Sequence, residues 1–305
     1  MTNIPCGLSL AISSVQYSGS GTERPDGKSV RRLEAEDIMA TVTRGGTRYS
    51  LEGAGNAMPV VLVHGLGLNR GMWQWQTDAL AQRYKVITYD LVGHGQTPAG
   101  GDVPTLAALS EQLRELLDHL NIERAAVAGF SLGGMIVRRF AMDHPDRLWS
   151  LIILNSAHAR TSAATKAVQD RVDQARRDGP SATVGAALDR WFSEPYRVRH
   201  PEVMAQIRTW IMANDNQVYP GNYQLLVDGV DELIAPDPPI ACPTLVMTGA
   251  DDFGNSPSMS EAIAGEIAGA RLVILEGLRH MAMVEAPDVF NHELVSFLDD
   301  VSRTS

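Results

Sequence analysis

The stretch Gly-Phe-Ser-Leu-Gly-Gly, residues 129–134, stands between the apolar run 125–128 and a segment that suits a helix, 132–144. This order predicts a strand, a tight turn and a helix, with Ser131 at the apex of the turn. The first and fifth residues of the stretch fit the G-x-S-x-G pattern, in which glycine lets strand and helix approach closely and the serine takes a strained conformation. A serine hydroxyl needs such a position, beside a base and the amides of a helix N-terminus, to act as a nucleophile. Ser131 is therefore a candidate nucleophile, and the alternative is an ordinary strand-to-helix turn.

Apolar runs alternate with amphipathic segments on both sides of this stretch. Residues 60–63 are a β-branched run without polar alternation, as in strands covered on both faces, and residues 86–90 are expected to form the next strand. In segment 105–119, leucines recur at three- and four-residue steps, which predicts a helix packed on the sheet. The alternation predicts an α/β fold with a doubly wound, mostly parallel sheet, whose ligands bind at the carboxyl ends of the strands. The other expected strands are 40–43, 48–52, 150–154, 244–248 and 271–275, and the other expected helices are 71–82 and 286–301.

The alternation of strands and helices stops between residues 159 and 240. This pattern predicts a helical cap over residues 159–240, inserted into a core made of residues 39–158 and 241–305. Prolines at 236, 238 and 239 mark the return to the core. The cap helices are expected near 164–178, 181–193, 201–214 and 221–233.

Residues 1–38 are rich in serine, glycine and charged residues and have no sustained hydrophobic period. This composition predicts a mobile N-terminal arm. Met39 directly precedes the first strand-like run, so one hypothesis makes Met39 the natural start of the protein; a chain starting there that failed to fold or lost activity would contradict it. The alternative is an arm that packs on a partner subunit of a homo-oligomer.

Two further residues at expected strand ends complete a catalytic constellation with Ser131. His280 lies on a glycine-containing loop after the last expected strand, and the near-neutral pKa of histidine suits a general base. Asp252 follows the preceding expected strand, where a carboxylate can orient the imidazole and stabilise its charged form. Its neighbour Asp251 is expected to cap the turn or to face solvent. The G-x-S-x-G turn is known as the nucleophile elbow, and the acid and then the base follow its serine along the chain. The order Ser131, Asp252, His280 agrees with this.

The loop after residues 60–63 supplies candidate donors for an oxyanion. Gly65 and Gly67 free the backbone of this loop, so the amide of Leu66 is expected to point at a developing oxyanion together with the amide of Leu132. These two backbone N–H groups are the predicted oxyanion hole.

Several other conspicuous side chains have a simpler interpretation. His64 and His94 each lie in a glycine turn at a strand end, where hydrogen bonds to neighbouring backbone are favoured over a catalytic role. His144, His158 and His200 show no metal-like grouping, so no metal site is expected.

Four residues are candidates for the substrate pocket: Trp73, Trp191, Trp210 and Arg160. Tryptophans at helical spacing also occur as simple core packing, which is the alternative for the first three. Arg160 could bind a substrate carboxylate, and its alternative is a solvated position at the start of the cap.

Composition excludes several classes of partner. The net charge of −10 and the isoelectric point near 5.3 argue against nucleic acid and anionic membrane surfaces, so a small molecule is the expected partner. Cys6 and Cys242 lie far apart without metal-ligand spacing and are expected to be free thiols in a reducing compartment. No apolar run approaches the roughly 18 residues of a membrane span, and a cytoplasmic location is expected.

From about Met39 to the C-terminus, the chain resembles the α/β-hydrolase superfamily. Within it, residues 129–136, Leu-Asn-Ser-Ala at 154–157 and Asp-Arg-Trp-Phe at 189–192 look most like 3-oxoadipate enol-lactonases. The oxyanion loop differs, because enol-lactonases carry an Asn-Ser-Leu-Gly-like segment where this chain has His-Gly. The superfamily motifs are His64-Gly65-Leu66-Gly67, Asp90-Leu91-Val92-Gly93-His94-Gly95, Gly129 to Gly134, Gly249-Ala250-Asp251-Asp252, and His280 followed by Glu285-Ala286-Pro287.

The resemblance implies a serine hydrolase that cleaves a small to medium carboxylic ester or lactone through an acyl-enzyme, without a cofactor. C–C bond hydrolases of ring-fission products share the triad and are the second candidate, although their usual longer oxyanion loop and Asn-Ser-Met-Gly-Gly-like elbow are not found in this chain. From a different class, a ligand receptor without turnover remains an alternative on this fold, as does a cofactor-independent oxygenase or lyase.

Overall fold

A computed structural model of the chain describes residues 12–15, 41–101 and 103–303. Cys6, Met39 and most of the expected arm, 1–38, lie outside these residues. Within the arm, Ile12–Val15 form strand β1, which pairs in parallel with the last strand and which the sequence did not predict.

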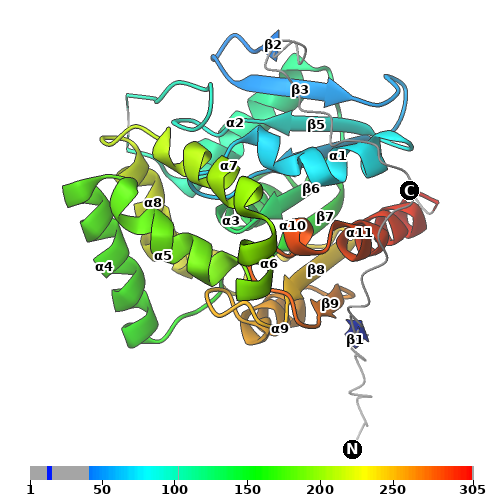
Figure 1. Cartoon of the computed structure of the whole chain (residues 1–305). Helices are drawn as coiled ribbons and strands as arrows, with labels where there is room; N and C mark the ends of the chain where they lie inside the picture. Colours follow the sequence, from blue (N-terminus) through cyan, green and yellow to red (C-terminus); the bar gives the residue numbers. More distant parts are fainter. Residues whose placement is uncertain (1–11, 16–40, 102, 304–305) are drawn as a thin grey trace, which may run out of the picture.

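The described strands form one nine-stranded sheet in the order β1-β9-β8-β7-β6-β4-β5-β3-β2 (Figure 1). All neighbours are parallel except the β2/β3 and β3/β5 pairs. The predicted α/β fold with a doubly wound, mostly parallel sheet and an inserted helical cap is thus confirmed. The other strands are β2 Thr41–Val42, β3 Arg48–Glu52, β4 Pro59–Val63, β5 Lys85–Tyr89, β6 Ala125–Phe130, β7 Leu148–Leu154, β8 Thr244–Gly249 and β9 Arg271–Leu275.

Successive side chains of the central strands point to opposite faces of the sheet and pack into two separate apolar cores, one on each face. Val61 and Val127 pack with the helices of one face, and Val60 and Leu62 with those of the other. The first face carries α2 Leu106–His119, α3 Leu132–Asp143 and α9 Pro257–Glu266, and the second carries η1 Arg70–Trp73, α1 Gln74–Ala81, α10 Ala282–Glu285 and α11 Pro287–Ser302.

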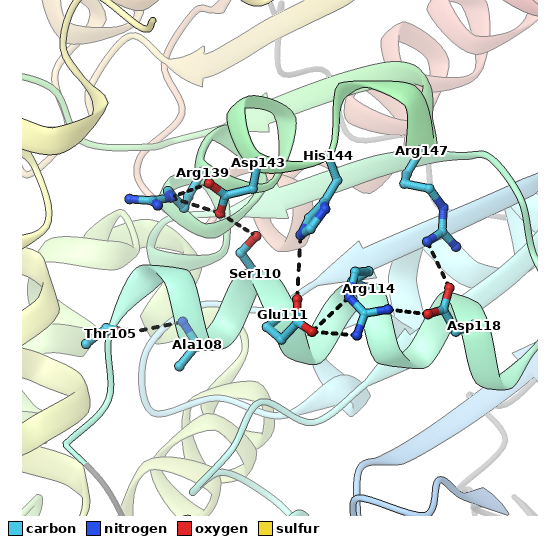
Figure 2. Close-up of polar contacts among 10 residues, drawn as sticks. All are labelled: Thr105, Ala108, Ser110, Glu111, Arg114, Asp118, Arg139, Asp143, His144 and Arg147. Carbon is cyan, nitrogen blue, oxygen red and sulfur yellow. Dashed lines mark hydrogen bonds and ion pairs between the residues drawn. The ribbon is translucent and has the colours of Figure 1, made fainter. Parts of the chain in front are cut away.

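Helix α2 begins where the sequence predicts, because the Thr105 side chain accepts a hydrogen bond from the Ala108 amide and caps the helix. Its polar face is tied to α3 and to the short helix η2, Pro145–Arg147. Figure 2 shows these contacts, in which Ser110 Oγ donates to Asp143 at 3.0 Å and Arg147 pairs with Asp118 at 2.8 Å. They hold in place the helix that follows Ser131.

The chain between β7 and β8 is helical, and its helices lie together as one group (Figure 1). Ile207 and Ile211 pack into the second core, and Val168 and Val172 into the first, so the cap rests on both. The cap helices are α4 Ser162–Asp178, α5 Ser181–Trp191, α6 Glu194–Arg199, α7 Pro201–Met212 and α8 Tyr219–Asp228, followed by η3 Asp231–Leu233. In the parts of the chain that the structure describes, no helix is both long and apolar enough to cross a membrane.

Candidate active site

Ser131 occupies a strained turn between β6 and α3. Its φ of +56° lies in the left-handed region that a residue with a side chain seldom adopts. The turn is fixed by its amide, which donates to Leu154 O at 2.9 Å, and by its carbonyl, which accepts from Ser156 Oγ at 3.0 Å. A Cβ on Gly129 would lie 2.2 Å from Gly133 O, so only glycine permits this approach of strand and helix.

The loop after β4 lies beside this turn because β4 and β6 are neighbours in the sheet, with Val63 opposite Gly129. The chain continues from β4 to β5 on one side and returns to β6 on the other, so this is the topological switch point where ligands bind in such sheets. Leu132 is the first residue of α3, and its amide has no acceptor within the helix. Leu66 follows Gly65 at the end of β4 and faces the same cavity as Ser131.

His64 holds the loop after β4 in shape. Its Nδ1 donates to Gly65 O at 2.8 Å, and its Nε2 accepts from the Leu91 amide at 3.0 Å. Burial lowers its pKa to about 4, although the hydrogen bond to Gly65 opposes the shift. His64 is therefore a neutral structural residue, as predicted, and it joins the ends of β4 and β5.

Asp252 and His280 form a buried pair. His280 Nδ1 lies 2.7 Å from Asp252 Oδ2, and their residues are 6% and 2% exposed. Oδ1 of Asp252 accepts from the amides of Gly254 and Asn255, both at 3.0 Å. Burial would raise the pKa of the Asp252 carboxyl, but the charge of His280 and these hydrogen bonds outweigh burial and lower it. The neighbouring Asp251 is exposed.

Asn155 is a further member of this cluster for which the sequence predicted no role. Its Nδ2 donates to Asp252 Oδ2 at 3.0 Å and to Thr248 Oγ1 at 3.1 Å. It follows β7 and has a φ of +48°, a conformation that asparagine tolerates better than most residues. The asparagine of the Leu-Asn-Ser-Ala motif was visible in the sequence, but its distance from the aspartate was not.

Ser131, Asp252 and His280 line one cavity of about 80 Å³ together with Leu66. The His280 ring lies near two aromatic side chains, with its centroid 4.8 Å from that of Phe130 and 5.9 Å from that of Trp191. Ser131 Oγ makes no hydrogen bond with the described residues, and in free enzymes such bonds are often long until substrate binds.

Two of the four predicted pocket residues line this cavity, and two do not. Trp191 and Arg160 are among its lining residues. Trp73 is fully buried in the second core, and Trp210 packs against that core beside Gly71. The prediction that Trp73 and Trp210 line the pocket is therefore corrected, because their apolar rings are used to pack the loop and cap against the core.

Three basic and aromatic groups of the cavity were missed by the sequence analysis. Arg171 comes from α4, Arg190 from α5 and Tyr219 from α8. The available signal was the presence of basic residues on two cap helices, four on α4 and one on α5. Nothing in the periodicity of these helices distinguished a face toward the cavity from a face toward solvent.

Residues 58–287 match a family described as the alpha/beta hydrolase fold. The chain is 28% identical over 249 residues to (E)-2-((N-methylformamido)methylene)succinate hydrolase of Acinetobacter baylyi, covering 80% of this chain and 92% of that protein. It is 28% identical over 271 residues to 3-oxoadipate enol-lactonase 1 of the same organism, covering 88% and 99%. The crystal structure of the enol-lactonase from Burkholderia xenovorans LB400 matches with a TM-score of 0.78 and 32% identity, covering 83% of this chain and 96% of that one.

Proposed function

The chain belongs to the alpha/beta hydrolase fold family, and from this premise we propose that it is a serine hydrolase that cleaves a small carboxylic ester or lactone. The single observation that carries the proposal is the meeting of Ser131, His280 and Asp252 in one cavity, with His280 hydrogen-bonded to the buried carboxylate.

In the proposed mechanism, His280 takes the proton of Ser131 Oγ as this oxygen attacks the substrate carbonyl. Asp252 binds Nδ1 of His280, which leaves Nε2 as the basic nitrogen and stabilises the imidazolium that forms. The amides of Leu66 and Leu132 hold the oxyanion of the tetrahedral intermediate. The C–O bond then breaks as His280 gives its proton to the leaving oxygen, which departs as the alcohol of an ester or stays attached to the acyl chain of a lactone. The acyl-enzyme that remains is hydrolysed by a water that the neutral His280 activates.

The size of the cavity supports a small substrate. Its volume of about 80 Å³ is well below the roughly 300–1,000 Å³ of typical ligand pockets. Because two of the similar proteins are named as enol-lactonases, an enol-lactone is the first cyclic substrate to test. A lactone is a cyclic ester, so the same triad can cleave both kinds of bond by the same steps.

The test is turnover of a panel of 4-nitrophenyl esters, small enol-lactones and ring-fission products by the wild-type chain, Ser131→Ala and the control Ser181→Ala. Ser181 is an exposed serine at the start of α5. We expect a burst of nitrophenol followed by steady turnover, a loss of at least roughly 10³-fold in kcat for Ser131→Ala, and no loss for Ser181→Ala.

Other outcomes identify the alternatives. Cleavage of ring-fission products without ester or lactone cleavage would favour C–C bond hydrolysis. Binding without multiple turnover would favour a ligand receptor. Equal turnover by Ser131→Ala and the wild type would refute Ser131 as the nucleophile.

A further inference from the structure

Three arginines of the cap line the cavity that holds Ser131 and His280. Arg160 precedes α4, Arg171 lies within α4 and Arg190 lies in the last turn of α5. All three side chains are half-buried. Three arginine residues of the cap thus line a cavity of about 80 Å³.

None of these arginines is ion-paired with a carboxylate among the described residues. Arg160 donates to Leu226 O at 2.6 Å, and Arg171 Nε donates to Tyr223 OH at 3.1 Å. Both acceptors are uncharged. The one carboxylate of the cavity lining, Asp252, is engaged by His280 and Asn155.

Most other half-buried or buried arginines among the described residues are ion-paired, with Arg48 and Arg279 as the exceptions. Arg138 lies 3.6 Å from a carboxylate oxygen of Glu266, and Arg271 lies 2.8 Å from Glu293. Charges removed from water are normally compensated in this way, because their desolvation is otherwise unfavourable. The three cavity arginines lack such a partner, and they do so together within one small site.

Helix electrostatics do not account for the cluster. The helix dipole favours a cation at the last turn of α5, where Arg190 lies, but disfavours one before the N-terminus of α4, where Arg160 lies. Burial lowers the pKa of Arg160 and of Arg190, and the charge of Arg171 lowers both further. The cluster is therefore a region of mutual repulsion that a bound anion would relieve.

We propose that Arg160, Arg171 and Arg190 bind a free carboxylate of the substrate, so that the substrate is an ester or lactone carrying a second, ionised carboxyl group. This inference rests on the proposed hydrolase function, because that function determines where the reacting bond lies relative to the bound carboxylate. The planar guanidinium fork matches a carboxylate and binds it through paired N–H···O bonds. The same carboxylate fixes the orientation of the substrate, with the scissile carbonyl left at Ser131.

The test compares two esters that differ in one charge. The first is mono-(4-nitrophenyl) glutarate, and the second is the same compound with its free carboxyl methylated. The variants are Arg171→Gln and Arg190→Gln, with the control Arg177→Gln, an exposed arginine on the same helix as Arg171. Arg190→Lys tests whether charge alone restores binding.

The wild-type chain should prefer the anionic ester in kcat/KM. Each of the two glutamine variants should lower the ratio of anionic to neutral kcat/KM by roughly 10- to 100-fold, the range for a lost hydrogen bond to a charged group. Arg190→Lys should restore part of the ratio, and Arg177→Gln should leave it unchanged. Ratios that are equal in the wild type and in both glutamine variants would overturn the proposal.

A binding measurement separates this proposal from the hydrolase function. Glutarate titrated into the wild-type chain should bind, and Arg190→Gln should weaken it at least tenfold. Binding that depends on Arg190 without turnover of either ester would support the anion site and refute the hydrolase. Turnover of both esters without glutarate binding would support the hydrolase function and refute the anion site. Binding of inorganic phosphate in preference to glutarate would overturn the assignment to a carboxylate.

Discussion

Replacing Asn155 tests how the acidic member of the triad is held. Asp252 accepts four hydrogen bonds from described residues, and the Asn155 amide supplies one of them at 3.0 Å. A hydrogen bond to a charged group contributes about 1.5–3 kcal/mol. Asn155 Oδ1 is buried without a partner among the described residues, so its removal offsets part of this loss. We expect Asn155→Gly to lower the free energy of unfolding by about 1–3 kcal/mol at pH 7.

A second variant separates the side chain from the backbone. Because Asn155 has a φ of +48°, Asn155→Ala should be about 1 kcal/mol less stable than Asn155→Gly, which tolerates this conformation. Both variants should also lose activity, since the carboxylate that orients His280 is less firmly held.

The pH dependence of stability gives a further check. The folded pKa of Asp252 lies below its ordinary 3.8, so its ionised form stabilises the fold above that pH, and this stabilisation is lost as the pH falls through the folded pKa. Removing Asn155 raises the folded pKa. The difference between wild type and variant, measured by urea denaturation, should therefore be full at pH 7 and should disappear as the pH falls through the folded pKa of the wild type, below 3.8. A variant Asn155→Gly within about 0.5 kcal/mol of wild type at pH 7, with unchanged activity, would refute this reasoning.

Two other predictions concern the frame of the site. Gly133→Ala would place a Cβ 2.3 Å from Val63 O and should cost at least about 3 kcal/mol in thermal or urea unfolding, whereas Gly185→Ala, in open space on α5, should add about 0.5–1 kcal/mol; equal effects would contradict the close approach. The pKa of His64 falls from 6.5 to about 4 on folding, so His64 binds a proton more readily in the unfolded chain. The free energy of unfolding should therefore fall as the pH drops below 6.5, by about 2 kcal/mol at pH 5. His64→Asn should remove that part of the pH dependence, and an unchanged slope would show that His64 does not titrate in this way.

Much of the core could be predicted from the sequence because its signals are local. The strand expected at 271–275 is β9, and the helix expected over 105–119 is α2 with Thr105 as its cap. The positions of Ser131, Asp252 and His280 follow from the same logic, since the carboxyl ends of parallel strands meet at one edge of the sheet.

Elements without a strong apolar period were not predicted. Helix α9 contains serine, glycine and glutamate and only two large apolar side chains, and α6 is only six residues long. Both are fixed by tertiary packing rather than by a local pattern. Strand β1 depends on pairing with β9, more than 250 residues later in the chain, and its sequence neighbours give no sign of that partner.

The cap shows the same limit at the level of side chains. Trp73 and Trp191 are chemically identical, yet the first packs in the core and the second lies beside His280. A cap helix contacts the core, other cap helices and solvent at once, so its hydrophobic period does not say which face meets the substrate. For this reason Arg171 and Arg190 could not be assigned to the cavity from their spacing.

The most direct test of the proposed nucleophile is intact-mass spectrometry after exposure to a small organophosphonate ester, with the wild-type chain and Ser131→Ala compared. If Ser131 is activated by His280 and Asp252, the wild type gains the mass of one phosphonyl group and the variant gains none. An unmodified wild type, or an equal adduct on both chains, would contradict the assignment of Ser131 as the activated nucleophile.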